Sequence, residues 1–330
     1  MTRREAEQIV ERFASKRVLV VGDLMVDEYI GGSVSRVSPE APVLVLNAQS
    51  HVFMPGGAAN VVAQIRALGA EAVLAGVVGR DVVGERLIEE LHNLGADTSA
   101  VVVTADRPTT QKTRIVAGAQ QVVRVDREVR APLPPDVADA LASRAAELLT
   151  VCDALLFSDY DKGVLGRALV RILIEKARPR ALPVTANPKP ASATFYAGAD
   201  VAQFNKHEAD LALGTTRSFE DGDETFHAAG TRLCALLAVR RLLITRGAQG
   251  LTLFDENGGH TDIAARRVDV FDGTGAGDST ISGLTLALAA GGSPVQAAAI
   301  GNAAGGAVVR KVGVATAAPG EVLALFDILL

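Results

Sequence analysis

The sequence Gly273-Thr274-Gly275-Ala276-Gly277-Asp278 joins a glycine-rich turn to an apolar helix, which we expect over residues 279–290. Glycines lack side chains, so successive backbone N–H groups can approach an anion, and a helix N-terminus adds partial positive charge. A phosphoryl group in transfer is such an anion, and Asp278 could accept the proton of the attacking hydroxyl. The alternative is an ordinary helix start after a flexible turn, where Asp is common.

Outward from this turn, short apolar runs alternate with helical patterns. The run Arg17-Val18-Leu19-Val20-Val21 ends in Gly22-Asp23 and predicts a buried strand. Further strands are expected over residues 72–78, 154–158, 183–186, 201–204 and 242–245. Helices are expected over residues 58–68, 84–94, 135–149, 166–177 and 225–238. This alternation predicts an α/β fold with a central mostly parallel sheet, which binds ligands beyond the carboxyl ends of its strands.

Two segments interrupt the alternation. Residues 29–53 contain the apolar run Val43-Leu44-Val45-Leu46, and residues 101–127 contain period-two stretches such as residues 122–127. The period-two pattern predicts antiparallel strands with one face in water. We expect the two segments to form a small antiparallel β lid on a single domain that spans residues 1–330. A pair of edge hairpins is the alternative.

Composition and missing motifs exclude several classes of protein. Aromatic residues make up 4% of the chain, Trp is absent and the net charge is −5, which together argue against a nucleic-acid partner. No uncharged apolar run is long enough to cross a membrane. Cys152 and Cys234 fit neither a disulfide framework nor a zinc motif, so we expect a cytoplasmic protein. The P-loop motif is absent, and no dinucleotide fingerprint follows the first strand.

A second glycine cluster, Pro55-Gly56-Gly57-Ala58-Ala59-Asn60, opens the helix expected over residues 58–68. The glycines would let the backbone approach a ligand, and the Asn60 amide suits sugar hydroxyls. Asp23, at the end of the first strand, is expected to join them in a sugar pocket. A tight turn that only packs the helix is the alternative.

These two clusters resemble the two signatures of the ribokinase-like (phosphofructokinase B) carbohydrate kinases. The first signature covers Gly56 to Asn60 and continues to Leu68-Gly69 and Val78-Gly79, and the second covers Asp272 to Asp278. Between and after them, Asn205-Lys206-His207-Glu208 resembles the family's N-x-x-E element, Thr245 to Gly250 its nucleotide turn, and Asn302 a residue of its late adenosine-side helix. The resemblance covers residues 17–316 and implies a ribokinase-like three-layer sandwich with a β lid.

Three further segments resemble the heptose branch of that family, the D-glycero-β-D-manno-heptose-7-phosphate kinases of lipopolysaccharide-core synthesis. They are residues 36–43, 120–126 and 158–163. The branch implies ATP-dependent phosphorylation of the anomeric 1-hydroxyl to give the 1,7-bisphosphate. Some members carry a fused nucleotidyltransferase domain, but this chain ends at Leu330 and resembles the stand-alone kinase. It departs from the family pattern at Gly273, Val62, Asn187 and Asp161.

The resemblance also implies roles for individual residues. Asp278 would be the general base, and the amides of Gly275, Ala276 and Gly277 would stabilise the transferring group. Because a helix N-terminus favours the charged form of a carboxylate, we expect Asp278 to be a weak base. The substrate-binding candidates are Asp23, Gly56, Gly57, Asn60, Lys112, Arg114, Arg124 and Lys162. The nucleotide-binding candidates are Lys189, Asn205, Glu208, Thr245, Gly247, Gly250 and Asn302. Asn205 and Glu208 would also hold Mg²⁺, through water.

The implied ligands are ATP, Mg²⁺ and a sugar phosphate, and the implied assembly is a homodimer through the lid. Whether a monovalent cation binds near Asp272 is left open. Two other functions also stay open: another kinase of this fold, acting on fructose phosphate, ribose or a keto-deoxy sugar, and a non-catalytic sugar- or nucleotide-binding regulator. The intact Gly-Ala-Gly-Asp sequence argues against the regulator, because a pure binder does not need a positioned base.

Overall fold

The structure is a computed structural model that describes residues 1–118, 120–220 and 222–328. Its large sheet has nine strands in the order β13-β12-β11-β10-β9-β8-β1-β4-β5. The strands from β11 to β5 in that order are parallel, and β12 and β13 add an antiparallel edge. In chain order their bounds are β1 Arg17–Gly22, β4 Glu71–Gly79, β5 Asp97–Thr104, β8 Ala154–Ser158, β9 Val184–Asn187, β10 Val201–Asn205, β11 Arg241–Thr245, β12 Leu251–Asp255 and β13 His260–Ile263.

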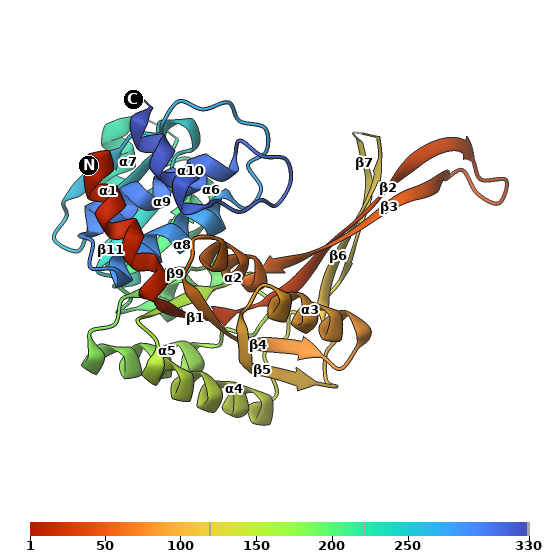
Figure 1. The fold of residues 1–330 in the computed structure, drawn as a ribbon, viewed down its shortest axis with the longest axis horizontal. Helices are drawn as coiled ribbons and strands as arrows, with labels where there is room; N and C mark the ends of the chain where they lie inside the picture. Colours follow the sequence, from red (N-terminus) through yellow and green to blue (C-terminus); the bar gives the residue numbers. More distant parts are fainter. Residues whose placement is uncertain (119, 221, 329–330) are drawn as a thin grey trace.

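Helices cover both faces of this sheet, as the alternation predicted (Figure 1). Along β1, Val18 and Val20 join one hydrophobic core while Leu19 and Val21 join the other, because successive strand residues point to opposite faces. The helices whose apolar side chains build the first core are α1 Arg3–Val10, α2 Ala58–Ala67, α3 Val82–Asn93, α8 Ala276–Ala289, α9 Pro294–Val308 and α10 Pro319–Ala324. Those of the second core are α4 Pro135–Leu148, α5 Arg167–Ala177, α6 Lys206–Leu213 and α7 Asp223–Leu237. The predicted three-layer α/β sandwich is confirmed.

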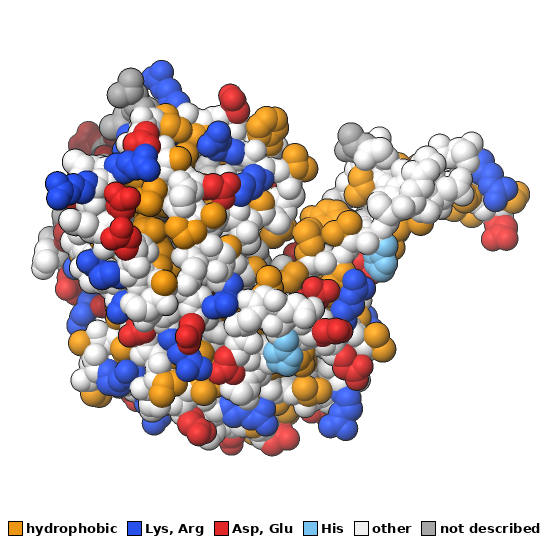
Figure 2. All heavy atoms as spheres, viewed as in Figure 1, with side chains coloured by type: hydrophobic (Ala, Val, Ile, Leu, Met, Phe, Trp, Pro, Cys, Tyr) orange, Lys and Arg blue, Asp and Glu red, His pale blue; other side chains and the backbone are white. Residues whose placement is uncertain are grey.

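A second sheet forms the lid, in the order β3-β2-β6-β7. Its strands are β2 Leu24–Val37, β3 Leu44–Gly57, β6 Thr110–Ala117 and β7 Gln120–Arg127. Each hairpin is antiparallel, but the two hairpins meet through parallel pairing of β2 with β6. Residues 101–104, expected in the lid, lie instead in β5 of the large sheet. The lid extends from the body as a long arm (Figures 1 and 2).

The lid and the large sheet meet at the carboxyl end of β1. A Cβ on Gly22 would lie 2.1 Å from the Ser158 carbonyl oxygen, so only glycine allows β1 and β8 to close at this point. Asp23 follows, and β2 then leaves toward the lid. This connection places the lid, together with α2 and α8, at the carboxyl ends of the strands, where a parallel sheet binds its ligands. Among the described residues, no helix is both long and apolar enough to span a bilayer.

Candidate active site

The glycine-rich turn forms the N-terminus of α8. Gly275 is the N-cap and has a φ of +80°, a conformation that glycine adopts without strain. Ser279 donates its N–H to the Gly275 carbonyl at 3.0 Å, so the N–H groups of residues 275–278 precede the helical pattern. The Ala276 N–H donates to the Gly273 carbonyl at 3.3 Å. The amides of Gly275 and Gly277 are therefore better placed than that of Ala276 to receive an anion.

Asp278 lies in the first turn of α8 and is only 6% exposed. Its Oδ2 accepts a hydrogen bond from Asn60 Nδ2 at 2.6 Å, and its Oδ1 accepts one from the Tyr160 hydroxyl at 2.7 Å. Asn60 comes from α2, and Tyr160 comes from the loop after β8. The carboxylate is thus held in place by two segments far away in sequence, as a base that must meet a substrate hydroxyl requires.

The environment of Asp278 reverses the expectation of a weak base. Burial raises the pKa of Asp278 above its usual range, and hydrogen bonds from Tyr160 and Asn60 offset only part of that effect. Desolvation penalises the charged carboxylate more than these partners and the helix N-terminus favour it. The expectation was wrong because the sequence shows the helix terminus but does not show that it is buried.

This raised pKa predicts the acid limb of the pH profile. A general base at Asp278 would have to be ionised, so kcat/KM should fall as the pH drops through the pKa of Asp278, at a pH above the usual aspartate range. A pH series of initial rates with saturating ATP measures it. An acid limb at or below the pKa of an ordinary, solvated aspartate would contradict the burial argument.

A cavity of about 200 Å³, here the lid-side cavity, opens between the lid and α8 and includes Asp278 in its wall. Five predicted substrate-binding residues line it: Gly56, Gly57, Asn60, Lys112 and Arg114. Asp27 of β2 lines it too, and Arg114 donates a hydrogen bond to Asp27 Oδ1 at 2.5 Å. A Cβ on Gly56 would lie 2.3 Å from Asp27 Oδ2, so a side chain at this position would displace the carboxylate that faces the cavity.

Asp23 does not line this cavity, contrary to the prediction. It is 1% exposed, and its carboxylate accepts hydrogen bonds from the backbone N–H groups of Tyr160, Lys162 and Val164. Burial raises the pKa of Asp23 to about 6, against the effect of these hydrogen bonds. Asp23 therefore holds the loop that carries Tyr160, and Asp27 is the carboxylate that faces the cavity.

Two predicted cations are also engaged elsewhere. Lys162 is 5% exposed, and its Nζ lies 2.6 Å from a Glu128 carboxylate oxygen. Arg124 of β7 is half-exposed and pairs with both carboxylate oxygens of Asp126, at 2.8 and 3.0 Å. Neither lines the lid-side cavity. Alternation along a strand indicates which side of the lid a residue occupies, but not whether a neighbouring carboxylate already binds it.

A second cavity, of about 180 Å³, lies on the other side of Asp278 at the ends of β10 and β11, and is here called the sheet-edge cavity. It shares Tyr160, Gly275 and Asp278 with the lid-side cavity. Predicted residues in its wall are Lys189, Asn205, Glu208, Thr245 and Gly277. The carboxylate of Asp278 therefore stands in a wall common to two adjoining cavities.

Asn205 and Glu208 form a capping box at the N-terminus of α6. The Glu208 N–H donates to Asn205 Oδ1 at 2.8 Å, and the Asn205 N–H donates to Glu208 Oε2 at 3.2 Å. Glu208 Oε1 also lies 2.6 Å from Lys189 Nζ. All these oxygens already accept a hydrogen bond, but each has a second lone pair that can bind a water of hydrated Mg²⁺.

The buried Gln203 Oε1 in the same cavity has no hydrogen-bond partner among the described residues, and the Nε2 of that side chain donates to the Gly277 carbonyl at 2.9 Å. A metal-bound water would supply the missing donor. The oxygen-rich wall of the cavity therefore fits a hydrated Mg²⁺ ion.

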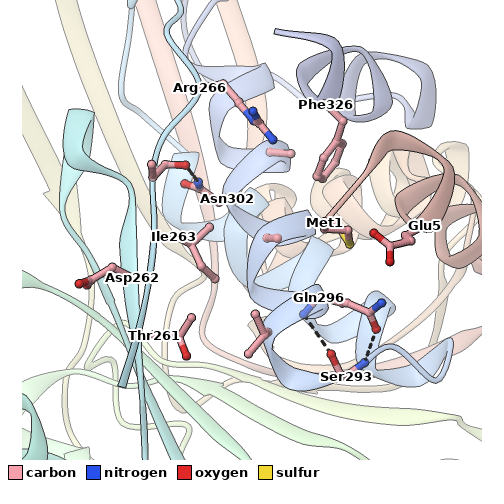
Figure 3. A pocket seen from close by; sticks show the side chains of 14 residues that line it. Met1, Glu5, Thr261, Asp262, Ile263, Arg266, Ser293, Gln296, Asn302 and Phe326 are labelled. Atoms are coloured by element: carbon pink, nitrogen blue, oxygen red, sulfur yellow. Dashed lines mark hydrogen bonds between the residues drawn. The ribbon is translucent and has the colours of Figure 1, made fainter. Parts of the chain in front are cut away.

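The remaining nucleotide-side predictions lie farther from Asp278. Gly247 and Gly250 form a turn after β11, in which Arg246 N–H donates to the Gly250 carbonyl at 2.7 Å. Asn302 of α9 donates to the Ala264 carbonyl at 2.9 Å and lines a separate cavity of about 680 Å³ between β13, α9 and the two ends of the described chain (Figure 3). None of these three residues lines either cavity that includes Asp278.

Three further residues at the site, Tyr160, Asp27 and Gln203, were not predicted from the sequence. Tyr160 lies within the segment 158–163, which resembles the heptose branch. Its hydroxyl contacts Asp278 because Asp23 binds the backbone of the loop that carries it. Asp27 could have been found from its alternation with Met25 along β2. Two departures from the family pattern also have structural reasons. Asp161 has a φ of +57°, which Asp tolerates better than most residues, and Asn187 lines the sheet-edge cavity.

Comparison with known proteins places this site in a family. The pfkB family carbohydrate kinase model matches residues 15–320. Bifunctional protein HldE of Pelobacter propionicus is 38% identical over 290 residues, which cover 88% of this chain and 59% of that protein. The HldE protein of Caulobacter vibrioides is 41% identical over 279 residues, 84% of this chain and 56% of its own length. The chain thus spans less than two thirds of these curated relatives.

Solved structures agree at the level of the fold. Escherichia coli phosphofructokinase-2 in complex with potassium superposes with a TM-score of 0.76 at 18% identity, covering 94% of this chain and 98% of that one. Arabidopsis thaliana ribokinase complexed with ribose and ATP gives a TM-score of 0.73 at 18% identity, covering 95% and 99%. The chain belongs to the pfkB family of carbohydrate kinases.

Proposed function

We propose that this protein transfers the γ-phosphoryl group of ATP to the anomeric 1-hydroxyl of D-glycero-β-D-manno-heptose 7-phosphate, giving the 1,7-bisphosphate. The observation that carries the proposal is the position of Asp278 in the common wall of the lid-side and sheet-edge cavities. A sugar in one cavity and a triphosphate in the other would meet at this carboxylate. A regulator that only binds ligands would have no use for a desolvated base at that junction.

In this mechanism Asp278 orients the sugar hydroxyl and accepts its proton. Tyr160 and Asn60 hold the carboxylate toward the lid-side cavity, and the incoming hydroxyl takes the place of one of their hydrogen bonds. The amides of Gly275 and Gly277 donate to the transferring group, a contribution of roughly 3–4 kcal/mol per donor in comparable anion sites. Phosphoryl transfer depends chiefly on such positioning and charge stabilisation.

The nucleotide lies on the sheet side. Lys189, 2.6 Å from Glu208, supplies positive charge next to Asp278, and Thr245 borders the same cavity. Mg²⁺, when bound, neutralises charge on the phosphates, and Asn205 and Glu208 would hold it through its waters. The adenosine extends past Gly247 and Gly250 toward Asn302. A monovalent cation near Asp272 stays an open proposal.

Two observations support a phosphorylated sugar. Lys112 and Arg114 extend from β6 into the lid-side cavity, where they can bind a phosphate at the far end of the sugar. The heptose itself is favoured by the resemblance of residues 36–43, 120–126 and 158–163 to the heptose branch. Asp27 and Asn60 line the same cavity and would bind the sugar hydroxyls, since an amide or a carboxylate can bridge two neighbouring hydroxyl groups.

The test is coupled ADP release with purified protein, Mg-ATP and a panel of acceptors. The panel comprises heptose 7-phosphate, fructose 6-phosphate, fructose 1-phosphate, ribose and 2-keto-3-deoxygluconate. Turnover selective for heptose 7-phosphate is expected. Selective turnover of another sugar would keep the kinase and discard the heptose. Ligand binding without turnover of any acceptor would favour the regulator.

The lid also supports a homodimer as a proposal. Several apolar side chains on it are exposed: Val37, Val43, Leu44, Val52, Val122, Val123 and Val125. The lid projects from the body and is free to meet the lid of a second copy (Figure 2). Exposed apolar residues gathered on a projecting sheet typically mark an interface. Light scattering of the purified chain would show a dimer mass, and a monomer at all concentrations would exclude it.

A further inference from the structure

A cluster of metal-ligating side chains lies away from Asp278, at the β13 edge of the large sheet. It consists of His227 of α7 with His260 and Asp262 of β13, and one ligand atom from each lies within 4.8 Å of the others. His260 and Asp262 are alternate residues of one strand, so both point to the same face. Asp262 also borders the cavity of about 680 Å³ that Thr261 and Ile263 line, but in Figure 3 its side chain points away from these two residues. The side chains of His260 and Asp262 thus lie on the face of β13 opposite to those of Thr261 and Ile263.

The contacts within the cluster leave ligand atoms accessible. The two imidazole rings stack with centroids 3.8 Å apart and an interplanar angle of 18°. His227 Nε2 lies 3.3 Å from Asp262 Oδ2. His260 is exposed on the edge strand, and the side chain of Asp262 is 48% exposed. An ion can therefore reach all three residues from solvent.

Neighbouring residues orient the carboxylate of Asp262. Its Oδ1 accepts hydrogen bonds from Thr252 Oγ1 at 2.5 Å and from Arg246 at 3.2 Å. Oδ1 is thus anchored while Oδ2 faces His227. Outer contacts of this kind are typical of metal ligands, which they hold in one orientation.

We propose that His227, His260 and Asp262 bind a divalent transition-metal ion such as Zn²⁺. Two imidazole nitrogens and one carboxylate oxygen suit Zn²⁺ and are poor ligands for Mg²⁺, which prefers oxygen. Water completes a tetrahedral set. Zinc bonds place ligand atoms about 3.4 Å apart, so the rings must tilt out of their stack. Rotation of the exposed His260 side chain provides this movement without a change in the backbone.

The site lies away from Asp278, although Asp262 borders the cavity that Asn302 lines. None of its three residues lines the lid-side or the sheet-edge cavity. Zn²⁺ binding can therefore be measured on tag-free protein without ATP or sugar, and a failure of the kinase assay would not affect the result. The chain also supplies matched controls: His51 and His92 are exposed histidines that contact Glu28 and Thr98 instead of a second histidine.

The experiment is isothermal titration of the full chain with Zn²⁺, repeated with the variants His260→Ala, Asp262→Asn, His51→Ala and His92→Ala. The native chain and the two control variants, His51→Ala and His92→Ala, should each bind one equivalent of Zn²⁺. Affinity should fall more than about 100-fold in His260→Ala, because loss of even an outer contact of a ligand costs 10–100-fold. The Co²⁺ form of the native chain should show the visible absorption of a tetrahedral site, and His260→Ala should lose it.

Two outcomes would overturn the proposal. The first is that the native chain binds no Zn²⁺ at this stoichiometry. The second is that His260→Ala and Asp262→Asn bind Zn²⁺ as tightly as the controls, which would assign the ion to another surface. His227 contacts Phe226 and Phe254, so His227→Ala risks a folding defect, whereas His260 lies on an exposed edge. Excess Mg²⁺ should not compete with Zn²⁺ in the native chain.

Discussion

Asp278→Asn should lower kcat by about 100- to 10,000-fold, the usual contribution of a positioned general base. The substituted amide keeps the shape of the side chain and an oxygen that accepts from Tyr160, but it cannot take a proton from the sugar. The KM for ATP should stay within a few-fold of the native value, because the nucleotide lies on the sheet side. Coupled ADP release with heptose 7-phosphate measures both quantities.

The stability of this variant provides an internal check. Burial raises the pKa of Asp278 in the folded state, so this carboxyl contributes stability at low pH that is lost as the pH rises through the folded pKa. Above that pKa the buried charge opposes folding, and a neutral Asn should leave the melting temperature unchanged or raise it. Asp161→Asn, at an exposed carboxylate in the Tyr160 loop, is the control and should retain activity. Near-native turnover of folded Asp278→Asn would remove Asp278 from the role of base.

Arg114→Ala should raise the KM for heptose 7-phosphate by about 10- to 100-fold, since a hydrogen-bonded pair with a charged group contributes roughly 1.5–3 kcal/mol. Arg114 reaches the lid-side cavity and also holds Asp27 at 2.5 Å, so the substitution removes a phosphate ligand and releases a carboxylate that faces the sugar. The KM for ATP should change little. Initial-rate kinetics over both substrates separate the two effects.

Arg124→Ala is the matched control for this prediction. Arg124 is paired with Arg114 across β6 and β7, but its guanidinium is half-exposed and bound by Asp126. Its removal should change the KM for the sugar phosphate by less than about three-fold, in line with the small contribution of exposed ion pairs. An equal rise in the KM for the sugar phosphate in both variants would contradict a specific role of Arg114 and would indicate that the whole lid attracts the phosphate through its positive charge. With a dephosphorylated heptose, Arg114→Ala should raise the KM less, because only the release of Asp27 then affects binding.

The order of elements could be predicted from the sequence because local periodicity decides it. The strand expected over residues 154–158 is β8 with the same bounds, and the helix expected over residues 135–149 is α4 to within one residue. The strand signal is a short apolar run whose five residues are all buried, and the helix signal is an apolar face that recurs with the helical period. The first residues of the second lid segment were misplaced, because only the pairing of β5 with β4 assigns residues 101–104 to the large sheet.

The sequence alone determined the identity and order of the chemical groups: two glycine clusters, Asp278 beside one and Asn60 beside the other, and the polar pair Asn205 and Glu208. The tertiary structure decided which carboxylate faces the lid-side cavity, which cations line that cavity, and how basic Asp278 is. Asp23 and Asp27 are both acidic residues near the end of β1, yet Asp23 is buried and accepts hydrogen bonds from three backbone N–H groups of another loop, whereas Asp27 faces the cavity. Such differences arise from desolvation and from partners brought close by the fold, such as Tyr160 for Asp278, which no local pattern records.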